Sequence, residues 1–487
     1  MNELFPFQRR GIDFVEKSLK ETGASLLADE MGLGKTAQAL CVCQRMGLKK
    51  ILVVTRNGVK GAWRQEIGQW HESARWHVMP SGPGITNGTR DIVIQKAYDN
   101  MKEEPRAAVY LILHYDVLRL HIPELSQIKW DIIIADECQD IKNRKAQRTK
   151  ALKAIPTHYK LGLSGTPLVN RPDELWSVLN WFYPTRKQAD TFLGSPYFAG
   201  FWKFYEEYTR FTIHPYLGVR IIEGYKNLDL LHATLHRFTI RRLKKAELKD
   251  LPDKYYTYIP VELGQQQHRI YKQMEKEFIS WVGEQGETPL SAPSVLAQLM
   301  RLRMFADAYA DVQEVVEDGE VVDLRIRLVE PSAKADALMD IINDTNDKQF
   351  VVFTQFRDMV TIIASRLEKA GIPFVEFHGG IKEDQRARAV EQFQTGGAKV
   401  FLGTPQAGGV GLTLTAADTV IFVDRSWSPA INLQAEDRLH RIGQKSAVQV
   451  ITLEAQGTVD TGIEHLLRGK WHMIQQILDG PKGALLI

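Results

Sequence analysis

The stretch that decides the fold runs from residue 25 to residue 46 and reads SLLADEMGLGKTAQALCVCQRM. SLLA (25–28) has the composition of a buried strand, and AQALCVCQRM (37–46) has the apolar periodicity of a helix. The glycine-rich loop DEMGLGKT (29–36) joins them. A loop of this composition between a strand and a helix is typical of a phosphate-binding site. The stretch therefore predicts an α/β fold built around a bound phosphate.

The side chains of the loop suit a nucleoside triphosphate. Lys35 is expected to reach the terminal phosphates, and the Thr36 hydroxyl is expected to ligate Mg²⁺. The general pattern GxxxxGK[ST] requires glycine at position 29, where this chain has Asp29. The alternative is a glycine-rich helix entry that binds no ligand. The loop residues expected to hold the nucleotide are Met31, Gly32, Leu33, Gly34, Lys35 and Thr36.

Two further motifs follow apolar runs. After DIIIA (131–135), Asp136 is expected to hold Mg²⁺ and Glu137 to polarise an attacking water, the two acid roles in hydrolysis of a phosphoanhydride. Without the phosphate-binding loop at 29–36, this acidic pair would indicate only a solvent-exposed loop. Ser164 and Thr166 in LSGTP (163–167) either form a turn or, in this order of motifs, link the nucleotide to a neighbouring lobe.

Short continuous apolar runs alternate with helical patterns twice along the chain. Such runs are typical of parallel strands covered on both faces, so each half is predicted to be a parallel α/β lobe. The segment between them, 190–331, does not show this alternation of strands and helices. It contains a basic cluster at 237–254 and the acidic stretch DVQEVVEDGEVVD (311–323). In the acidic stretch, Asp318-Gly319 predicts a hairpin turn. The runs are 25–28, 50–54, 109–113, 131–135 and 159–163, then 350–353, 374–377, 399–402, 420–423 and 448–453.

The composition excludes several classes of protein. Of the 487 residues, 44% are hydrophobic and 25% are charged, which excludes disordered and fibrous chains. A net charge of +3 means that any nucleic-acid-binding surface must be local. Three cysteines cannot form a disulfide framework, and neither a signal peptide nor a long apolar stretch is evident, so we expect an intracellular protein with no membrane partner. In a prokaryote we expect the protein in the cytoplasm, associated with the nucleoid. For a viral protein we expect the cytoplasm of the host, and in a eukaryote the nucleus.

The order of these motifs resembles that of superfamily-two helicase motors, and specifically of the Swi/Snf family of DNA translocases. DEMGLGKT and DECQDIKN (136–143) are similar to the family forms, which accounts for Asp29. LFPFQRRG (4–11) resembles the glutamine motif, which makes Gln8 a clamp on adenine. ELWSVLNWFYP (174–184), RRLK (241–244) and LPDK (251–254) also match, whereas Thr55 replaces a usual proline and Cys138-Gln139 replaces a commoner Ala-His.

The second half carries the most specific motifs, GTPQAGGVGLTLTAAD (403–418), DRSWSP (424–429) and QAEDRLHRIGQ (434–444). Gly411 is expected at the nucleotide and Gln434 among the catalytic residues. Arg438 and Arg441 lie three apart, so on a helix they would share one face and point at a phosphate presented by the other lobe. Surface ion pairs with nearby acids are the alternative for these arginines.

The resemblance implies ATP and Mg²⁺ as cofactors, double-stranded DNA as the partner, DNA-bound proteins as remodelling targets, and a monomer. Gln139, Ser164 and Thr166 are implied to couple hydrolysis to movement. Trp427 either packs in the core or contacts DNA, and a hydrogen-bonded structural role is expected for His114 beside its candidacy as a contact. The implied DNA contacts are Arg56, Asn57, Lys60, His114, Tyr115, Lys142, Asn143, Thr354, Gln355, Thr404, Trp427 and Asn432.

The predicted architecture is therefore two tandem RecA-like parallel-sheet lobes with a mostly helical insertion between them and a C-terminal brace helix. Lobe one is expected over 1–188, the insertions over 189–331, lobe two over 332–455 and the brace over 456–487, with no room for accessory domains. The predicted activity is ATP-driven translocation on duplex DNA that remodels protein–DNA complexes, forks or annealed strands. The alternatives are a strand-separating DNA or RNA helicase and a non-hydrolysing DNA-binding scaffold.

Overall fold

The computed structural model describes residues 3–82, 84–168, 171–194, 198, 200–213, 220–284, 292–317, 320–345, 348–381, 383–408 and 412–483. The chain divides into two compact units. The first comprises residues 1–250 and 471–487, and the second comprises residues 251–470. About half of the chain is helical, and each unit contains a parallel sheet. The two predicted parallel-sheet lobes are thereby confirmed.

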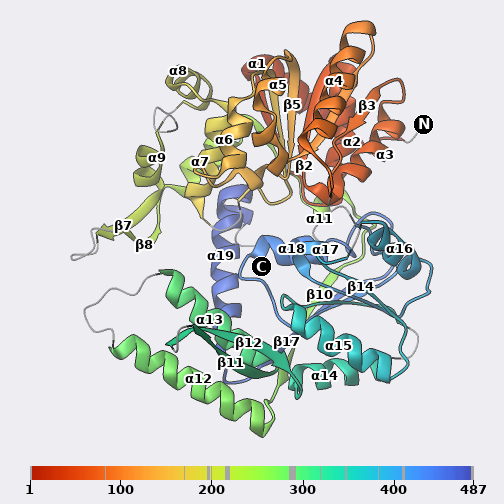
Figure 1. The fold of residues 1–487 in the computed structure, drawn as a ribbon. Coiled ribbons are helices and arrows are strands. Elements are labelled where there is room, and N and C mark those ends of the chain that lie inside the picture. The colour runs from red at the N-terminus through yellow and green to blue at the C-terminus, as the bar shows by residue number, and fades with distance from the viewer. Residues whose placement is uncertain are drawn as a thin grey trace. The chain divides into compact units, whose positions relative to one another are not determined.

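Unit one is built on a seven-stranded parallel sheet with the order β3-β4-β2-β5-β6-β1-β9. Figure 1 labels strands β2, β3 and β5 of this sheet among the helices of unit one. Each of the five apolar runs predicted in this half lies in a strand. The additional strands β3 and β9 are both at edges of the sheet. The bounds are β1 Ala24–Leu27, β2 Lys50–Thr55, β3 Arg75–Val78, β4 Val109–His114, β5 Trp130–Asp136, β6 Thr157–Leu163 and β9 Thr239–Ile240.

Alternate residues of these strands enter separate cores on the two faces of the sheet. Leu52 and Val54 of β2 join one core, whereas Ile51 and Val53 join the other, and all four are fully buried. Because both faces are covered, the strands read as unbroken apolar runs. The surrounding helices are α1 Pro6–Thr22, α2 Lys35–Arg45, α3 Lys60–Trp70, α4 Asn87–Glu103, α5 Ile122–Ser126, α6 Gln147–Ala154, α7 Leu175–Phe182, α8 Arg186–Gln188, α10 Leu228–Leu235 and α11 Lys244–Glu247.

An aromatic-rich insertion extends unit one. Helix α9 (Phe201–Tyr208) is followed by the antiparallel strands β7 (Thr209–Ile213) and β8 (Arg220–Tyr225). The rings of Phe198, Phe204 and Tyr208 meet at edge-on and tilted angles and join a core of the lobe. This part of the predicted insertion therefore packs as an extension of unit one.

Unit two holds a six-stranded parallel sheet with the order β10-β17-β16-β13-β15-β14. All five apolar runs predicted in this half form strands. The bounds are β10 Lys254–Val261, β13 Phe350–Phe353, β14 Phe374–Phe377, β15 Val400–Gly403, β16 Thr419–Phe422 and β17 Val448–Ala455. The helices are α12 Gln265–Glu284, α13 Ala292–Asp307, α14 Ala333–Asn343, α15 Arg357–Lys369, α16 Glu383–Gln394, α17 Pro405–Gly408, α18 Pro429–Glu436 and α19 Val459–Gly483.

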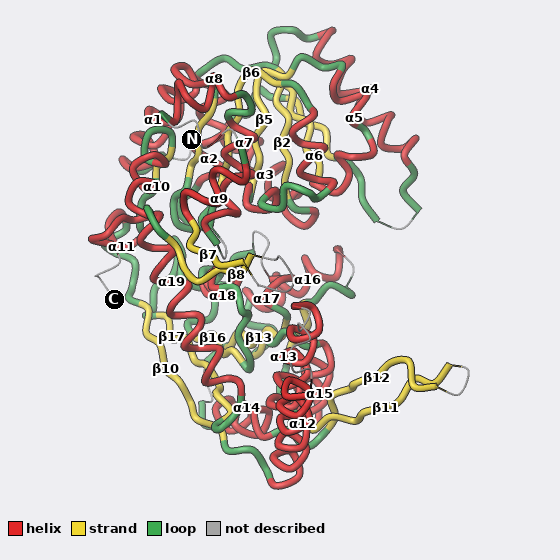
Figure 2. The backbone as a smooth tube through the Cα atoms, turned by 90° about the vertical axis from the view of Figure 1, so that its left-hand side faces the viewer, coloured by secondary structure: helices red, strands yellow, loops and turns green. Residues whose placement is uncertain are grey.

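Two features of the predicted insertion segment belong to unit two. Strand β10 pairs in parallel along the whole of β17, so this segment contributes an edge strand to the second sheet. Strands β11 (Tyr309–Glu317) and β12 (Glu320–Val329) form the expected antiparallel hairpin, which extends away from its neighbours in Figure 2. The predicted turn residues Asp318 and Gly319 lie outside the described residues.

Helix α19 begins in unit two and ends in unit one, over the region where a brace helix is implied. Asp479, near its end, forms an ion pair of 2.6 Å with Arg241 in unit one. Within the part of the chain that the structure describes, no helix combines the length and the apolar character needed to cross a bilayer.

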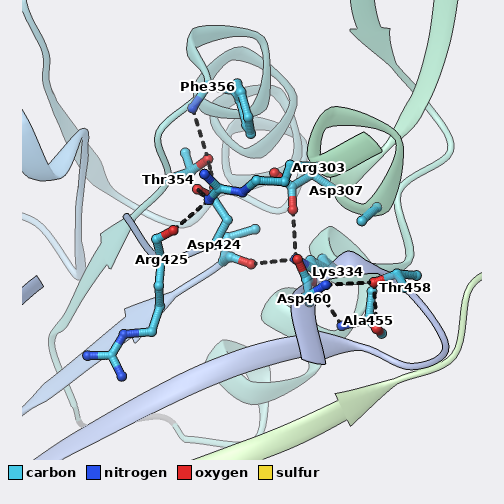
Figure 3. A network of polar contacts seen from close by, with 12 residues as sticks. Arg303, Asp307, Lys334, Thr354, Phe356, Asp424, Arg425, Ala455, Thr458 and Asp460 are labelled. Atoms are coloured by element: carbon cyan, nitrogen blue, oxygen red, sulfur yellow. Dashed lines mark hydrogen bonds and ion pairs between the residues drawn. The ribbon is translucent and has the colours of Figure 1, made fainter. Parts of the chain in front are cut away.

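A buried ionic network organises unit two (Figure 3). The Lys334 ammonium at the start of α14 is fully buried and lies 2.7 Å from Asp307 and 2.6 Å from Asp460, and it donates to the Val423 carbonyl. Burial lowers the pKa of Lys334, but the surrounding carboxylates outweigh that effect, so its pKa is raised and the ammonium stays charged. Lys334 thus joins the end of α13, the end of β16 and the start of α19.

We expect Lys334→Met to destabilise unit two by about 3–5 kcal/mol, because it leaves buried carboxylates without their cation. The free energy of unfolding in urea measures the loss. Lys272→Ala, which breaks an exposed ion pair with Glu275 on α12, is the matched control and should cost less than about 1 kcal/mol. Equal effects of the two substitutions would contradict the assigned role of Lys334.

Candidate functional site

The phosphate-binding loop connects β1 to α2 in unit one. Gly32 and Gly34 have φ values of 84° and 73°, in the left-handed region that favours glycine. Lys35 is the first residue of α2, and its ammonium donates to the carbonyls of Asp29 at 2.8 Å and Glu30 at 3.3 Å. The loop therefore has the left-handed glycines and the helix N-terminus that suit a phosphate site.

Gln8 packs directly on this loop. Its side-chain amide donates to the Leu33 carbonyl at 3.2 Å and accepts from the Phe5 amide at 3.0 Å. A Cβ atom added to Gly34 would lie 2.4 Å from the Gln8 amide nitrogen. The structure thus places the predicted base clamp beside the predicted phosphate loop.

Arg242 explains why this chain can have Asp29 where the general phosphate-loop pattern has glycine. The Asp29 carboxylate is fully buried, and both of its oxygens receive hydrogen bonds from the Arg242 guanidinium, the first at 2.8 Å. Arg242 also donates to Gln38 at 2.7 Å and to the Phe7 carbonyl. An acid can therefore replace glycine at position 29 because a buried cation neutralises it. The sequence placed Arg242 in a matching motif but gave no sign of this partner, 213 residues away.

The acidic pair lies at the carboxyl end of β5. One Asp136 oxygen accepts hydrogen bonds from Thr55 and from the Trp63 indole, each at 2.8 Å. Burial and the adjacent Glu137 raise the pKa of Asp136. Glu137 itself has a left-handed backbone with a φ of 52°. Two adjacent, partly buried carboxylates form a place where a divalent cation would be stabilised.

A chain of hydrogen bonds joins the acidic pair to the third motif. The Gln139 amide donates to Glu137 at 2.5 Å, and the Ser164 hydroxyl donates to Gln139 at 2.6 Å. The Ser164 oxygen in turn accepts from the Thr166 amide at 3.0 Å. The three residues predicted to couple hydrolysis to movement thus lie in one connected set beside Glu137.

The residues at this site fit ATP and Mg²⁺. The left-handed glycines and Lys35 at the start of α2 suit a phosphate group, and the Gln8 amide lies beside the loop, where it bonds to Leu33 and Phe5. Thr36 and Asp136 carry hard oxygen ligands of the kind that Mg²⁺ prefers. Met31 flanks the loop, where a Cβ atom on Gly165 would lie 2.6 Å from its side chain.

Several predicted DNA contacts in unit one have partners within the lobe. Arg56 forms an ion pair of 2.7 Å with Asp140, and Lys142 forms one of 3.2 Å with Glu174. Lys60 is buried and donates to the Met79 carbonyl, and Tyr115 is buried and donates to the Asp136 carbonyl at 2.8 Å. Lys60 and Tyr115 therefore hold the loops in place.

Three other predicted contacts in unit one differ in exposure. Asn57 is exposed, and the exposed Asn143 side chain accepts from the Lys145 amide. His114 ends β4 and is partly buried, and burial together with nearby Lys60 lowers its pKa to about 4. His114 is therefore neutral at physiological pH, and its Nδ1 atom is buried without a hydrogen-bond partner among the described residues, so the hydrogen-bonded structural role stays a prediction.

The backbone at Arg438 and Arg441 is not helical, contrary to the prediction. Helix α18 ends at Glu436, so Arg438 and Arg441 lie in the turns that follow it and do not share a helical face. Tertiary contacts explain the early end, because the Arg438 carbonyl accepts from the Leu414 amide and His440 bonds to the Pro252 carbonyl. Both guanidinium groups nevertheless donate to the Leu412 carbonyl, at 3.5 and 3.0 Å.

Other predicted site residues of unit two are placed as follows. Gln434 is buried in α18, and Thr404 is partly buried after β15. Gly411 lies outside the described residues. The Thr354 side chain is buried and donates to Asp424, and the buried Asn432 side chain bonds twice to the Ser426 backbone.

Gln355 and Trp427 are both partly buried. Gln355 accepts from Gln406 at 3.1 Å, and the Trp427 ring faces the Arg303 guanidinium at 5.3 Å. Core packing and DNA contact both stay predictions for Trp427, whose side chain is partly buried. Thr354, Gln355 and Trp427 lie on two loops that hydrogen bonds to Asp424 connect, and Asn432 lies in α18.

Comparison with protein families gives two matches. Residues 7–308 match the SNF2-related domain, and residues 333–443 match the helicase conserved C-terminal domain. The first match alone covers more than half of the chain.

Curated relatives align over nearly the whole chain. An uncharacterized ATP-dependent helicase of Mycoplasma genitalium is 28% identical over 98% of this chain. The SWI/SNF chromatin-remodeling complex subunit snf22 of Schizosaccharomyces pombe is 29% identical over 94% of this chain. Chromodomain-helicase-DNA-binding protein 1-like of Danio rerio is 29% identical over 99% of the chain. The chain spans less than half the length of these relatives, at 42%, 27% and 44%.

Among solved structures, the Sulfolobus solfataricus SWI2/SNF2 ATPase core in complex with dsDNA is 26% identical. It aligns over 100% of this chain and 95% of its own, with a TM-score of 0.42.

The pKa of His114 yields a pH prediction. Its folded-state pKa of about 4 is below the ordinary 6.5, so the unfolded chain binds more protons between these values. The stability that neutral His114 contributes is therefore complete above pH 6.5 and falls as the pH drops towards 4. We expect His114→Asn to reduce the loss of unfolding free energy between pH 7 and pH 4.5, measured in urea. Parallel pH profiles for the two proteins would exclude this role.

Proposed function

The chain belongs to the SNF2-related family, and we propose that it is an ATP-dependent translocase on double-stranded DNA. The observation that carries the proposal is the hydrogen-bonded set formed by Glu137, Gln139 and Ser164. A hydrolytic carboxylate bonded to a neighbouring motif can transmit the state of the nucleotide to other parts of the lobe. A simple phosphate-binding scaffold has no need of such a connection.

The residues of unit one would bind and orient ATP. Gln8 would hold the adenine, Lys35 would neutralise the terminal phosphates, and Thr36 with Asp136 would hold Mg²⁺, which supplies charge neutralisation on the phosphate oxygens. Glu137 would orient the attacking water and accept its proton. Its hydrogen bond to Gln139 fixes the carboxylate in a position suited to that task.

Unit two would complete the chemistry. We propose that Arg438 and Arg441, whose guanidinium groups converge on the Leu412 carbonyl, meet the triphosphate when the two units close. Planar guanidinium groups neutralise charge on a transferring phosphoryl group. Repeated closing and opening would advance a duplex held by its phosphates, because phosphates are common to every sequence.

Double-stranded DNA should raise the rate of ATP turnover strongly, and the purified chain should displace a third strand from a DNA triplex in an ATP-dependent manner. Both assays need Mg²⁺. Unwinding of a forked substrate without triplex displacement would instead show a strand-separating helicase. Equal ATP turnover with and without DNA would contradict the proposal.

Substitutions in the site test the assigned roles separately. Lys35→Ala and Glu137→Gln should abolish ATP turnover while DNA binding, measured by fluorescence anisotropy, stays near that of the unsubstituted protein. Arg441→Ala should lower the turnover rate about a thousandfold, as expected for an arginine finger. Lys272→Ala is the control and should leave turnover unchanged. Retained turnover in Glu137→Gln would remove the hydrolytic assignment.

A further inference from the structure

The two loops of unit two that carry the proposed DNA contacts are joined through Asp424. Its carboxylate accepts from the Thr354 hydroxyl at 2.6 Å and from the Gln355 amide at 3.1 Å. The Thr354 hydroxyl oxygen also faces the Phe356 amide at 3.4 Å. Because Asp424 begins the loop that carries Trp427, a single buried carboxylate sets the position of both loops.

Arg303 of α13 holds this junction from a third segment (Figure 3). Its side chain is 2% exposed, and its guanidinium lies 3.3 Å from the Asp424 carboxylate and donates to the Arg425 carbonyl at 2.5 Å. The same planar group lies 5.3 Å from the centre of the Trp427 ring and 5.8 Å from that of Phe356. Arg303 therefore contacts a residue of each loop as well as the carboxylate between them.

The backbone that carries Arg303 is itself fixed. The Gln267 side chain donates to the carbonyls of Phe305 and Ala306 at 3.2 and 3.1 Å. Asp307, the last residue of α13, forms its ion pair with the buried Lys334. A guanidinium on such a rigid base can restrict the Trp427 ring and the Asp424 carboxylate to one arrangement.

The Trp427 loop has two further restraints within unit two. The Lys470 ammonium donates to the Trp427 carbonyl at 3.1 Å, and the Asn432 side chain bonds to the backbone of Ser426. These contacts fix the backbone of the loop, whereas Arg303 is placed against the indole ring. The path of the loop backbone therefore depends mainly on Lys470 and Asn432, whereas the orientation of the Trp427 ring depends mainly on Arg303.

We propose that Arg303 is a positioning residue for DNA engagement, which presets the loops of Thr354–Gln355 and Asp424–Trp427 before duplex DNA binds. This inference rests on the proposed function. A planar guanidinium is required because one group must pair with a carboxylate, donate to a carbonyl and face two aromatic rings. A lysine ammonium could retain the charge but not the planar contacts.

The test compares Arg303→Met and Arg303→Lys with the unsubstituted protein and with Lys272→Ala. We expect Arg303→Met to raise the DNA concentration needed for half-maximal ATPase stimulation about tenfold, the equivalent of losing about 1.4 kcal/mol of binding free energy. ATP turnover without DNA should stay within about twofold, a change of less than about 0.5 kcal/mol in the barrier. Arg303→Lys keeps the buried charge pair and should show the same defect with a smaller loss of stability.

Amide hydrogen exchange supplies a second measurement that does not depend on DNA. Exchange should increase in both loops of Arg303→Met and stay unchanged in β15 and β17. An unchanged DNA response together with unchanged exchange in both loops would overturn the inference, as would full rescue by lysine.

The outcomes also separate this inference from the proposed function. If the unsubstituted protein shows no DNA stimulation, the proposed function fails, and hydrogen exchange alone decides whether Arg303 positions the loops. If Arg303→Met does not fold, Arg303→Lys carries both measurements.

Discussion

The ion pair between Asp29 and Arg242 is the interaction on which the nucleotide site depends. An ionised carboxylate at the mouth of a phosphate loop would repel phosphates and would be costly to bury alone. Arg242 removes both difficulties, and the same guanidinium reaches Gln38 on α2 and the Phe7 carbonyl in the glutamine motif. The segment that carries Gln8, the loop and helix α2 are thereby held together.

Unit two uses the same physical device at a different place. Lys334 and Arg303 are buried cations, and each joins segments that are distant in sequence through carboxylates or carbonyls at the ends of β16 and α13. Functional loops at the carboxyl ends of parallel strands have few backbone partners of their own. Buried ion pairs give such loops a defined position, which is why removing one partner is costly even if the pair adds little net stability.

The sequence predicted the central strands and the edge strand β14 but missed the edge strands β3, β9 and β10. Central parallel strands are buried on both faces, so β2, β5 and β13 read as unbroken apolar runs. Strand β10 lies at an edge, has exposed tyrosines at 255 and 256, and contains Pro260, which an edge strand tolerates because one side needs no hydrogen-bond partner. No apolar run marks such a strand, and its position follows from pairing with β17, almost two hundred residues away.

The local structure of the site was predictable where one short motif fixes the backbone, as in the phosphate loop and at Asp136 and Glu137 at the end of β5. It was less predictable where distant contacts decide the outcome. The spacing of Arg438 and Arg441 suits a helix, yet the contact of Arg438 with Leu414 and that of His440 with Pro252 end the helix first. The arginines still converge, because the Leu412 carbonyl replaces the helical face as the point that aligns them. The local conformation of Arg438 and Arg441 is therefore set by tertiary contacts and not by the spacing of the motif.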